Sequence, residues 1–240
     1  MDLSEAIKIR RSRRKYLATP VSGEIVSQLN SRIAEYNRES GLHMQPVINN
    51  GAAFQGIRRS YGMFSNVSNY IVLAGKQNDR NFEEKSGYYG EKLVLELTQA
   101  GLGTCWVGGS FDKKECVADL GEDETFVCVI VFGNIDKDVS VKERLISGAM
   151  HIKKKSAKEM CETKGEAPKW FWDGMEAVVR APSAVNRQPV TFVYESGKVS
   201  ARAKDITQHE PIDLGIAKLH FELGAGGGAW QWGNGGNYKK

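Results

Sequence analysis

The stretch that decides the fold is Gly101–Gly109, GLGTCWVGG, which follows a long amphipathic segment at residues 83–100. The pattern of residues 83–100 predicts a helix, and Gly101 is placed to end it. The pair Gly108 and Gly109 removes side chains at two adjacent positions, so backbone N–H groups can approach a ligand closely. A helix cap followed by a strand explains the same residues, and both interpretations stay open at this point.

The succession of helix, glycine turn and tryptophan occurs a second time near the C-terminus. At an offset of 126 residues the identical pairs are Lys92/Lys218, Leu93/Leu219, Glu96/Glu222, Leu97/Leu223, Gly101/Gly227, Trp106/Trp232 and Gly109/Gly235. Two amphipathic helices produce some matches by chance, but the shared glycine and tryptophan positions favour a tandem repeat. We therefore expect a first half at 1–150, a linker at 151–167 and a shorter second half at 168–240, packed like a two-fold dimer.

Further elements are expected on both sides of the deciding stretch. Ser22 is a suitable N-cap for one helix, and Gly41 lies just beyond its end. Residues 42–68 are irregular and rich in Asn and Gly. The patterns predict helices at 2–11, 23–38, 112–120, 169–180 and 212–223, strands at 70–74 and 125–132, and a hairpin of 190–195 with 198–204.

The composition is that of an ordinary globular domain. Hydrophobic residues make up 41% and charged residues 26% of the 240 residues. The longest wholly apolar run, Phe126–Phe132, has seven residues, whereas a membrane helix needs about 20. Asp2 and Glu5 interrupt the N-terminal region, which lacks the apolar core of a secretory signal. We expect a cytoplasmic protein that does not span a membrane.

Metal binding and nucleophilic catalysis find little support in the sequence. The four cysteines are widely spaced without a C-x-x-C motif, which predicts free thiols and no metal site. The four histidines lie far apart, and none is beside an obvious nucleophile, which argues against a Ser-His-Asp hydrolase. Gly224–Ala229 formally matches G-x-G-x-x-A, but a helix precedes it where a dinucleotide fingerprint needs a strand.

The net charge of +4 is concentrated at the N-terminus, where residues 1–15 hold six basic and two acidic side chains. Residues 10–15, RRSRRK, end the first predicted helix and offer guanidinium forks and the Ser12 hydroxyl to a phosphate. A solvated charged turn or a nucleic-acid tag explains the run as well. Because the rest of the chain is neutral overall, we expect no nucleic-acid partner.

A second polar cluster lies in Ala181–Pro189, APSAVNRQP, between a predicted helix and a predicted strand. Its Ser, Asn and Gln side chains supply donors and acceptors, which suits the edge of a planar heterocycle. The same residues are typical of an ordinary turn. The loop by itself favours neither interpretation.

Three motifs together resemble the nitroreductase-like flavoprotein family: I-x-x-R-R-S-x-R at Ile7–Arg14, A-P-S-A-x-N-x-Q-P at Ala181–Pro189, and GLGTCWVGG at Gly101–Gly109. Each motif is loose by itself, whereas the combination is specific. In the usual family member the first two motifs lie close together, and FMN binds at the interface of an obligate homodimer. Here about 170 residues separate them, so the chain resembles a single-chain branch of the family in which one chain mimics the dimer.

The resemblance implies an α+β fold of two degenerate repeats, each a mostly antiparallel sheet flanked by helices, packed as a pseudo-dimer. Asn49–Phe54 stands in the first half where the polar loop is expected, and Trp170–Asp173 stands in the second half in place of the arginine run. Because each half has only one of the two motifs, the resemblance implies one complete site and therefore one FMN per chain. A monomer or a weak homodimer is expected.

The family roles carry over by motif. The resemblance places Arg10, Ser12 and Arg14 at the FMN phosphate and ribityl end, with Arg11 on the pyrimidine side. It places the backbone N–H groups of Gly108 and Gly109 at flavin N5, and Lys155, in a weakly matching basic segment, at the phosphate. The predicted ring contacts are Pro182, Ser183, Ala184, Asn186 and Gln188. The substrate pocket stays unassigned.

The resemblance implies ping-pong chemistry, in which NAD(P)H gives hydride to flavin N5 and a nitroaromatic, quinone or similar small molecule then takes the electrons. No side chain is needed as a catalytic residue, because the flavin carries the reaction. Two alternatives stay open: a flavin-binding protein without efficient turnover, and a nucleic-acid binder whose affinity falls steeply with salt.

Overall fold

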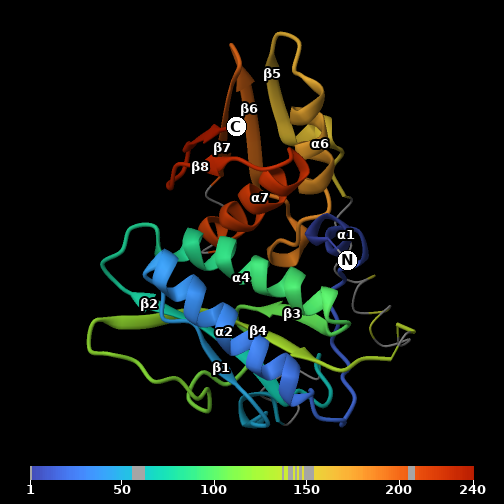
Figure 1. Cartoon of the computed structure of the whole chain (residues 1–240), viewed down its shortest axis with the longest axis vertical. Helices are drawn as coiled ribbons and strands as arrows, with labels where there is room; N and C mark the ends of the chain where they lie inside the picture. Colours follow the sequence, from blue (N-terminus) through green and yellow to red (C-terminus); the bar gives the residue numbers. More distant parts are fainter. Residues whose placement is uncertain are drawn as a thin grey trace. The chain divides into compact units, whose positions relative to one another are not determined.

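The computed structural model describes residues 2–55, 63–136, 138, 139, 143, 145, 148, 154–204 and 209–240 (Figure 1). The chain divides into two compact units that exchange segments along the sequence. Unit 1 contains Met1–Lys8, Arg80–Lys92 and Met150–Lys240, and unit 2 contains Ile9–Asp79 and Leu93–Ala149. Two elements, α1 (Leu3–Ile9) and α4 (Phe82–Gln99), contribute residues to both units.

Unit 2 is built on an antiparallel sheet with strand order β1-β2-β4-β3. Its strands are β1 (Gln45–Val47), β2 (Asn69–Lys76), β3 (Gly103–Val107) and β4 (Glu124–Gly133). The central strands β2 and β4 are joined in a register that sets Ile71 opposite Ile130, and both residues are fully buried. The uninterrupted apolar run of β4 is typical of a strand covered on both faces.

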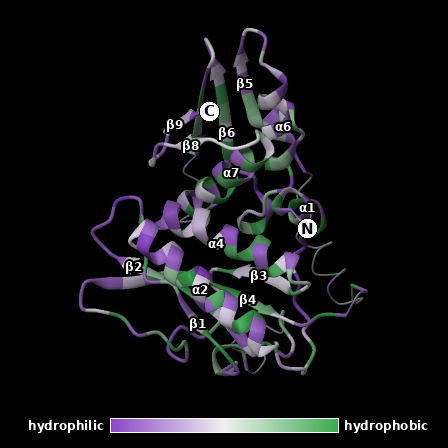
Figure 2. Ribbon diagram, in the orientation of Figure 1, coloured by the Kyte–Doolittle hydropathy of each residue, from purple (hydrophilic) through white to green (hydrophobic). Residues whose placement is uncertain are grey.

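The helix α2 (Gly23–Ser40) of unit 2 begins at the predicted residue and ends two residues beyond the predicted end, directly before Gly41. The Ser22 side chain accepts a hydrogen bond from the Ile25 N–H, and Gly41 at φ 74° ends the helix. Hydrophobic and hydrophilic residues alternate along α2, drawn green and purple in Figure 2. Its buried side includes Leu29 and Ile33, as a surface helix requires.

Unit 1 is built on a second sheet with strand order β5-β6-β7-β9-β8. The strands are β5 (Cys161–Lys164), β6 (Val190–Glu195), β7 (Lys198–Ala203), β8 (Ala229–Trp230) and β9 (Asn237–Lys239). β5 pairs parallel with β6, and the other pairs are antiparallel. Ser196 at φ 49° and Gly197 at φ 78° form the predicted hairpin turn, in which both central residues need positive φ.

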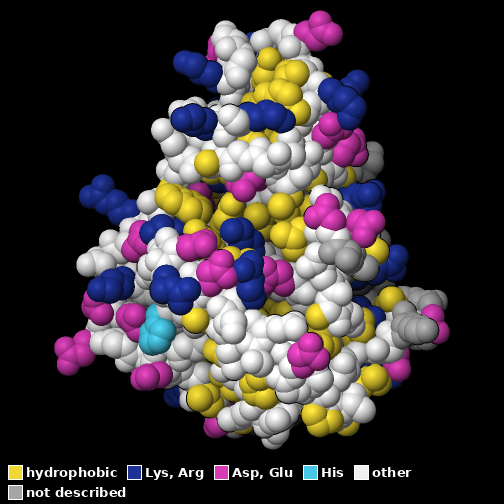
Figure 3. Space-filling model, viewed as in Figure 1, with side chains coloured by type: hydrophobic (Ala, Val, Ile, Leu, Met, Phe, Trp, Pro, Cys, Tyr) yellow, Lys and Arg dark blue, Asp and Glu magenta, His cyan; other side chains and the backbone are white. Residues whose placement is uncertain are grey.

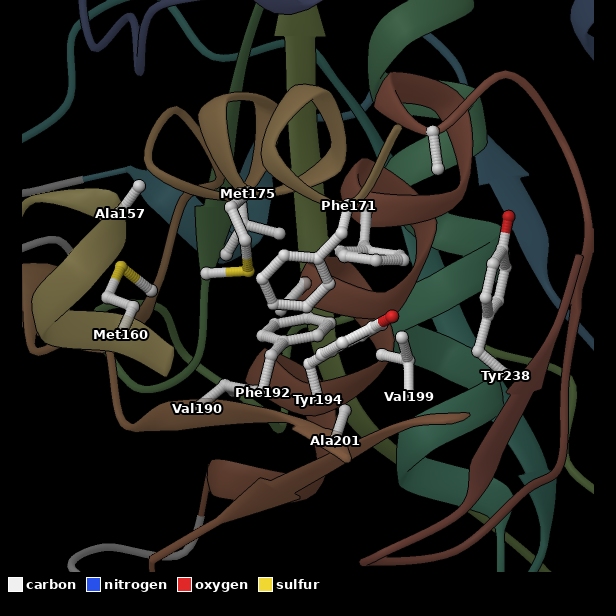
Figure 4. Close-up of a cluster of buried hydrophobic side chains, with 14 of the residues drawn as sticks. Ala157, Met160, Phe171, Met175, Val190, Phe192, Tyr194, Val199, Ala201 and Tyr238 are labelled. Carbon is white, nitrogen blue, oxygen red and sulfur yellow. The ribbon is translucent and has the colours of Figure 1, made fainter. Parts of the chain in front are cut away.

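The core of unit 1 lies between this sheet and the helices α6 (Lys169–Val178) and α7 (Glu210–Gly224). Figure 4 shows Phe171 and Met175 of α6 directed toward Phe192 of β6. The rings of Phe192 and Phe221 stack with centroids 5.0 Å apart. The aromatic segment at 170–172, which replaces the arginine run of the first half, thus belongs to the core of its own unit.

Two local predictions differ from the structure. Residues 112–120 do not form the predicted helix, because the segment bonds to distant residues of the sheet. The Val117 N–H donates to the Tyr70 hydroxyl at 3.0 Å, and Asp119 exchanges backbone hydrogen bonds with the Gln45 side chain. Within 42–68, expected to be irregular, β1 and a short 3-10 helix η1 (Ala52–Phe54) form.

The predicted linker at 151–167 contributes structure where it is described. A 3-10 helix η2 (Ala157–Met160) leads into β5, which joins the sheet of unit 1. Residues 151–153 lie outside the described part of the chain. Both helices of the suggested repeat, α4 and α7, are present, and the duplication itself stays a prediction.

Surface charge and hydropathy give two further findings. Figure 3 shows basic and acidic side chains interspersed over the visible face. Among the helices that the structure describes, none has the length and apolar character needed to cross a bilayer.

Candidate functional site

The candidate site in unit 2 begins with the basic run, which lies beside β3. The Arg13 N–H donates to the Thr104 carbonyl at 2.8 Å, and Ser12 forms a parallel bridge with Thr104. Lys15 forms a second bridge with Ser65. Within the run Arg13 is buried, whereas Arg11 and Lys15 are exposed.

Arg13 is buried, and its hydrogen bonds hold the basic run in place. Its guanidinium donates to Glu143 Oε1 at 3.2 Å and to the carbonyl oxygens of Asp136 and Asp138 at 3.0 and 3.2 Å. The same carboxylate oxygen accepts the backbone N–H groups of Arg14 and Lys15 at 2.7 and 3.1 Å. Arg13 and Glu143 are both buried, so this pair fixes the course of the chain through the basic run.

Arg10, Ser12 and Arg14 lie near Cys105, the central residue of β3. Burial raises the pKa of Cys105, while the charges of Arg14 and Arg10 and a hydrogen bond from Ser12 act to lower it. The carboxylate of Glu143 acts to raise it. Arg11, by contrast, is exposed.

The glycine turn at 108–109 directly follows β3. A Cβ added at Gly109 would meet no atom within 4 Å among the described residues, and the backbone there does not have the positive φ that favours glycine. At Gly103, by contrast, a Cβ would lie 2.3 Å from Ile135 Cγ2. Packing therefore explains why position 103 is a glycine, but it does not explain the glycine at position 109. The open space at Gly109 is consistent with close approach of a ligand to its backbone.

The polar loop of unit 1 connects α6 to β6 and contains an unusual concentration of left-handed backbone. Val185, Asn186 and Gln188 have φ values of 46°, 57° and 47°. Positive φ is a genuine outlier for a β-branched residue such as Val185, whose side chain is half exposed. Strained residues of this kind persist where surrounding bonds hold them, and they cluster at ligand-binding sites.

Two hydrogen-bonded groups hold the loop. At the N-terminal part of the loop, the Ala184 N–H donates to the carboxylate of Asp213 in α7. At its C-terminal part the buried Gln188 accepts the Lys155 N–H at 2.8 Å through its side chain, and the Lys155 ammonium donates to the Gln188 carbonyl at 2.7 Å. The Gln188 N–H donates to Ser183 Oγ at 2.9 Å. The structure therefore brings Lys155 and Gln188 together as loop supports, and their predicted contacts with a flavin stay predictions.

A recess opens beside this loop, with a cavity volume of about 10 Å³. Ligand pockets usually measure roughly 300 to 1,000 Å³, so the recess by itself does not accommodate the three fused rings of a flavin. It is lined by Met160, Val178, Ala181, Pro182, Ser183, Gln188, Pro189, Val190, Asp213 and Ala217.

Comparison with known proteins decides the family. A family model described as "Putative TM nitroreductase" matches residues 2–225. The chain belongs to this nitroreductase family. No curated protein matches it.

Solved nitroreductase structures are similar to the chain. A putative nitroreductase from Thermotoga maritima is 23% identical, with 99% of this chain and 92% of that chain covered and a TM-score of 0.66. A putative nitroreductase in complex with FMN from Desulfovibrio desulfuricans is 18% identical, covering 61% of this chain and 96% of that chain, with a TM-score of 0.44. The first likeness confirms the predicted nitroreductase-like α+β fold.

Sequence reasoning about this nitroreductase-family chain missed two residues of the site. Cys105 lies inside the deciding stretch, and its period-two alternation with its neighbours in β3 was an available signal. Asp213 carries no local signal, because its partner Ala184 lies 29 residues earlier in the chain.

Strain at Val185 gives a testable expectation for this member of the nitroreductase family. Val185→Gly is expected to stabilise the flavin-free protein by about 1 kcal/mol, because glycine lacks the Cβ that makes left-handed backbone costly. Arg187→Gly is the matched control, since Arg187 has an ordinary φ of −74° in the same loop. It is expected to destabilise by roughly 0.5 to 1 kcal/mol. Urea unfolding of both variants measures the difference, and a destabilised Val185→Gly protein would contradict strain at this position.

Proposed function

We propose that the chain is an FMN-dependent NAD(P)H oxidoreductase that reduces a nitroaromatic, quinone or similar small-molecule acceptor. The observation that carries the proposal is the proximity of Arg10, Ser12 and Arg14 to Cys105. Guanidinium forks and a hydroxyl form the donor set that suits a phosphate monoester. Membership of the nitroreductase family supports the same conclusion.

The residues of unit 2 also fit the length of the cofactor. Cys105 and Gly108 are three residues apart along one chain direction, which corresponds to roughly 10 Å in extended backbone. That length is comparable with the five-carbon chain that separates phosphate and ring in FMN. A phosphate held by Arg10 and Arg14 therefore leaves the turn at 108–109 within reach of the ring.

Each predicted group then has a defined task. When bound, FMN would supply the chemistry, accepting hydride from NAD(P)H and releasing electrons to the acceptor. Arg10, Arg14 and Ser12 bind the phosphate, with Arg11 and Lys155 as further predicted contacts. The N–H groups of Gly108 and Gly109 stabilise negative charge on the reduced ring. The loop residues Pro182, Ser183, Ala184, Asn186 and Gln188 are the predicted contacts of the ring.

The first experiment is the visible absorption spectrum of the purified protein, followed by acid release and quantitation of flavin against chain. We expect a flavin spectrum and saturation at one FMN per chain, together with NAD(P)H oxidation when a nitroaromatic or quinone is added. A protein that is colourless and takes up no added FMN would refute the proposal. Two FMN per chain would refute the single site, and tight FMN binding without NAD(P)H oxidation would indicate flavin storage.

A further inference from the structure

Asp213 is a buried carboxylate that the proposed reaction does not use. It lies in the first turn of α7 and is 5% exposed. Its oxygens Oδ1 and Oδ2 lie 3.0 and 3.2 Å from the backbone nitrogen of Ala184. The carboxylate thus accepts the N–H at the point where the loop enters the short 3-10 helix η3 (Ala184–Asn186).

Two backbone hydrogen bonds close turns within the loop. The Asn186 N–H donates to the Ser183 carbonyl, and the Arg187 N–H donates to the Ala184 carbonyl. The bond from Ala184 to Asp213 joins the N-terminal part of the loop to α7, and the bonds between Gln188 and Lys155 hold its other part.

We propose that Asp213 is a positioning residue, which holds Ser183–Asn186 in the conformation that binds the flavin ring. The inference rests on the proposed function, since it assigns to this loop the predicted ring contacts. Asp213 acts through the Ala184 N–H, and the groups that it positions are Ser183 and Asn186.

The charge state of Asp213 sets the strength of this support. Burial raises its pKa to about 7, opposed by the Ala184 hydrogen bond and assisted by the charge of Glu210 in the same helix turn. The other residues that line the recess, contributed by η2, α6, the loop and β6, carry no titratable side chain. A hydrogen bond to an ionised acceptor is roughly twice as strong as one between neutral groups. Burial therefore penalises the ionised carboxyl of Asp213, whereas the Ala184 N–H favours it.

The test uses Asp213→Asn, which keeps the shape and one acceptor, and Asp213→Ala, which removes both acceptors. At pH 8 the FMN dissociation constant is expected to rise about tenfold for Asn and up to 100-fold for Ala. Asp173→Asn is the matched control, because Asp173 is an exposed carboxylate of the same unit.

A second readout needs no flavin. In the FMN-free proteins, amide hydrogen exchange of a peptide covering residues 181–189 is expected to be at least tenfold faster in both Asp213 variants than in Asp173→Asn. Far-UV circular dichroism identifies a variant that fails to fold, and Asp213→Asn then carries the test. If wild type binds no FMN, the proposed function fails, whereas the exchange rates still report on the loop. Unchanged FMN affinity in a folded Asp213→Asn protein would overturn the assignment.

Discussion

Replacing Arg10 and Arg14 together by alanine is expected to weaken FMN binding by at least 100-fold. Each charge-assisted contact with a phosphate contributes about 1.5 to 3 kcal/mol, and the double variant removes both guanidinium groups that approach Cys105. Riboflavin, which lacks the phosphate, is expected to bind the wild type and the variant equally. Fluorescence titration with the two flavins therefore separates loss of phosphate contacts from general damage to the site.

The matched control is the double variant Lys8→Ala/Lys15→Ala. Both lysines are exposed and flank the two arginines in sequence, so the control removes the same charge near the same chain segment. Arg13, which anchors the run through Glu143, is left intact in both proteins. FMN affinity that falls equally in the two double variants would show that only long-range charge is at work, and would remove the arginines from the site.

Lys218→Met is expected to lower the free energy of unfolding by about 3 to 5 kcal/mol, because it leaves the carboxylate of Glu84 buried without its cation. Lys218 is fully buried, with its ammonium 2.5 Å from Glu84 Oε1. It also donates to the carbonyl oxygens of Gln231 and Gly233 at 2.9 and 3.1 Å. The other oxygen of Glu84 accepts the Gly233 N–H at 2.6 Å. The ion pair therefore fixes the glycine-rich chain that follows α7.

Urea unfolding followed by tryptophan fluorescence measures this effect. Trp230, whose indole donates to the Lys218 carbonyl at 2.9 Å, reports directly on the region. Lys169→Met is the control, since its pair with Asp173 is exposed and is expected to contribute less than about 1 kcal/mol. The double variant Glu84→Gln/Lys218→Met is expected to recover part of the loss. A Lys218→Met protein within 1 kcal/mol of wild type would contradict a structural role for the pair.

The features that the sequence predicts well are those with local causes. Ser22 and Gly41 delimit α2, and Ser196 with Gly197 turns the β6–β7 hairpin, because neighbouring residues determine both. The conformation of residues 112–120 is not determined locally, because backbone N–H groups of this segment donate to Tyr70 and Gln45, which lie in distant parts of the chain. The short strands β1, β8 and β9 likewise depend on partners that no local pattern reveals.

In the candidate site, too, some residues were predictable from the sequence and others were not. Arg10, Ser12 and Arg14 were predicted from a motif, and the structure brings them together beside Cys105. The groups that hold the site in place were not predictable, because their partners are remote. Arg13 pairs with Glu143 across 130 residues, and the Ala184 amide bonds to Asp213 across 29. A motif records what contacts a ligand, whereas the supports are visible only once the chain has folded.

The interleaved segments of the two units set the order in which the chain can fold during synthesis. Both segments of unit 2 precede residue 150, whereas unit 1 needs residues 80–92 together with the last part of the chain. Glu84 is made 134 residues before its partner Lys218, a delay of roughly 7 to 27 s at ribosomal rates of 5 to 20 residues per second. Throughout that interval α4 lacks the helix whose Lys218 and His220 contact its buried carboxyl groups, Glu84 and Glu91. A nascent chain is therefore exposed to chaperones and proteases at this helix until its final segment leaves the ribosome.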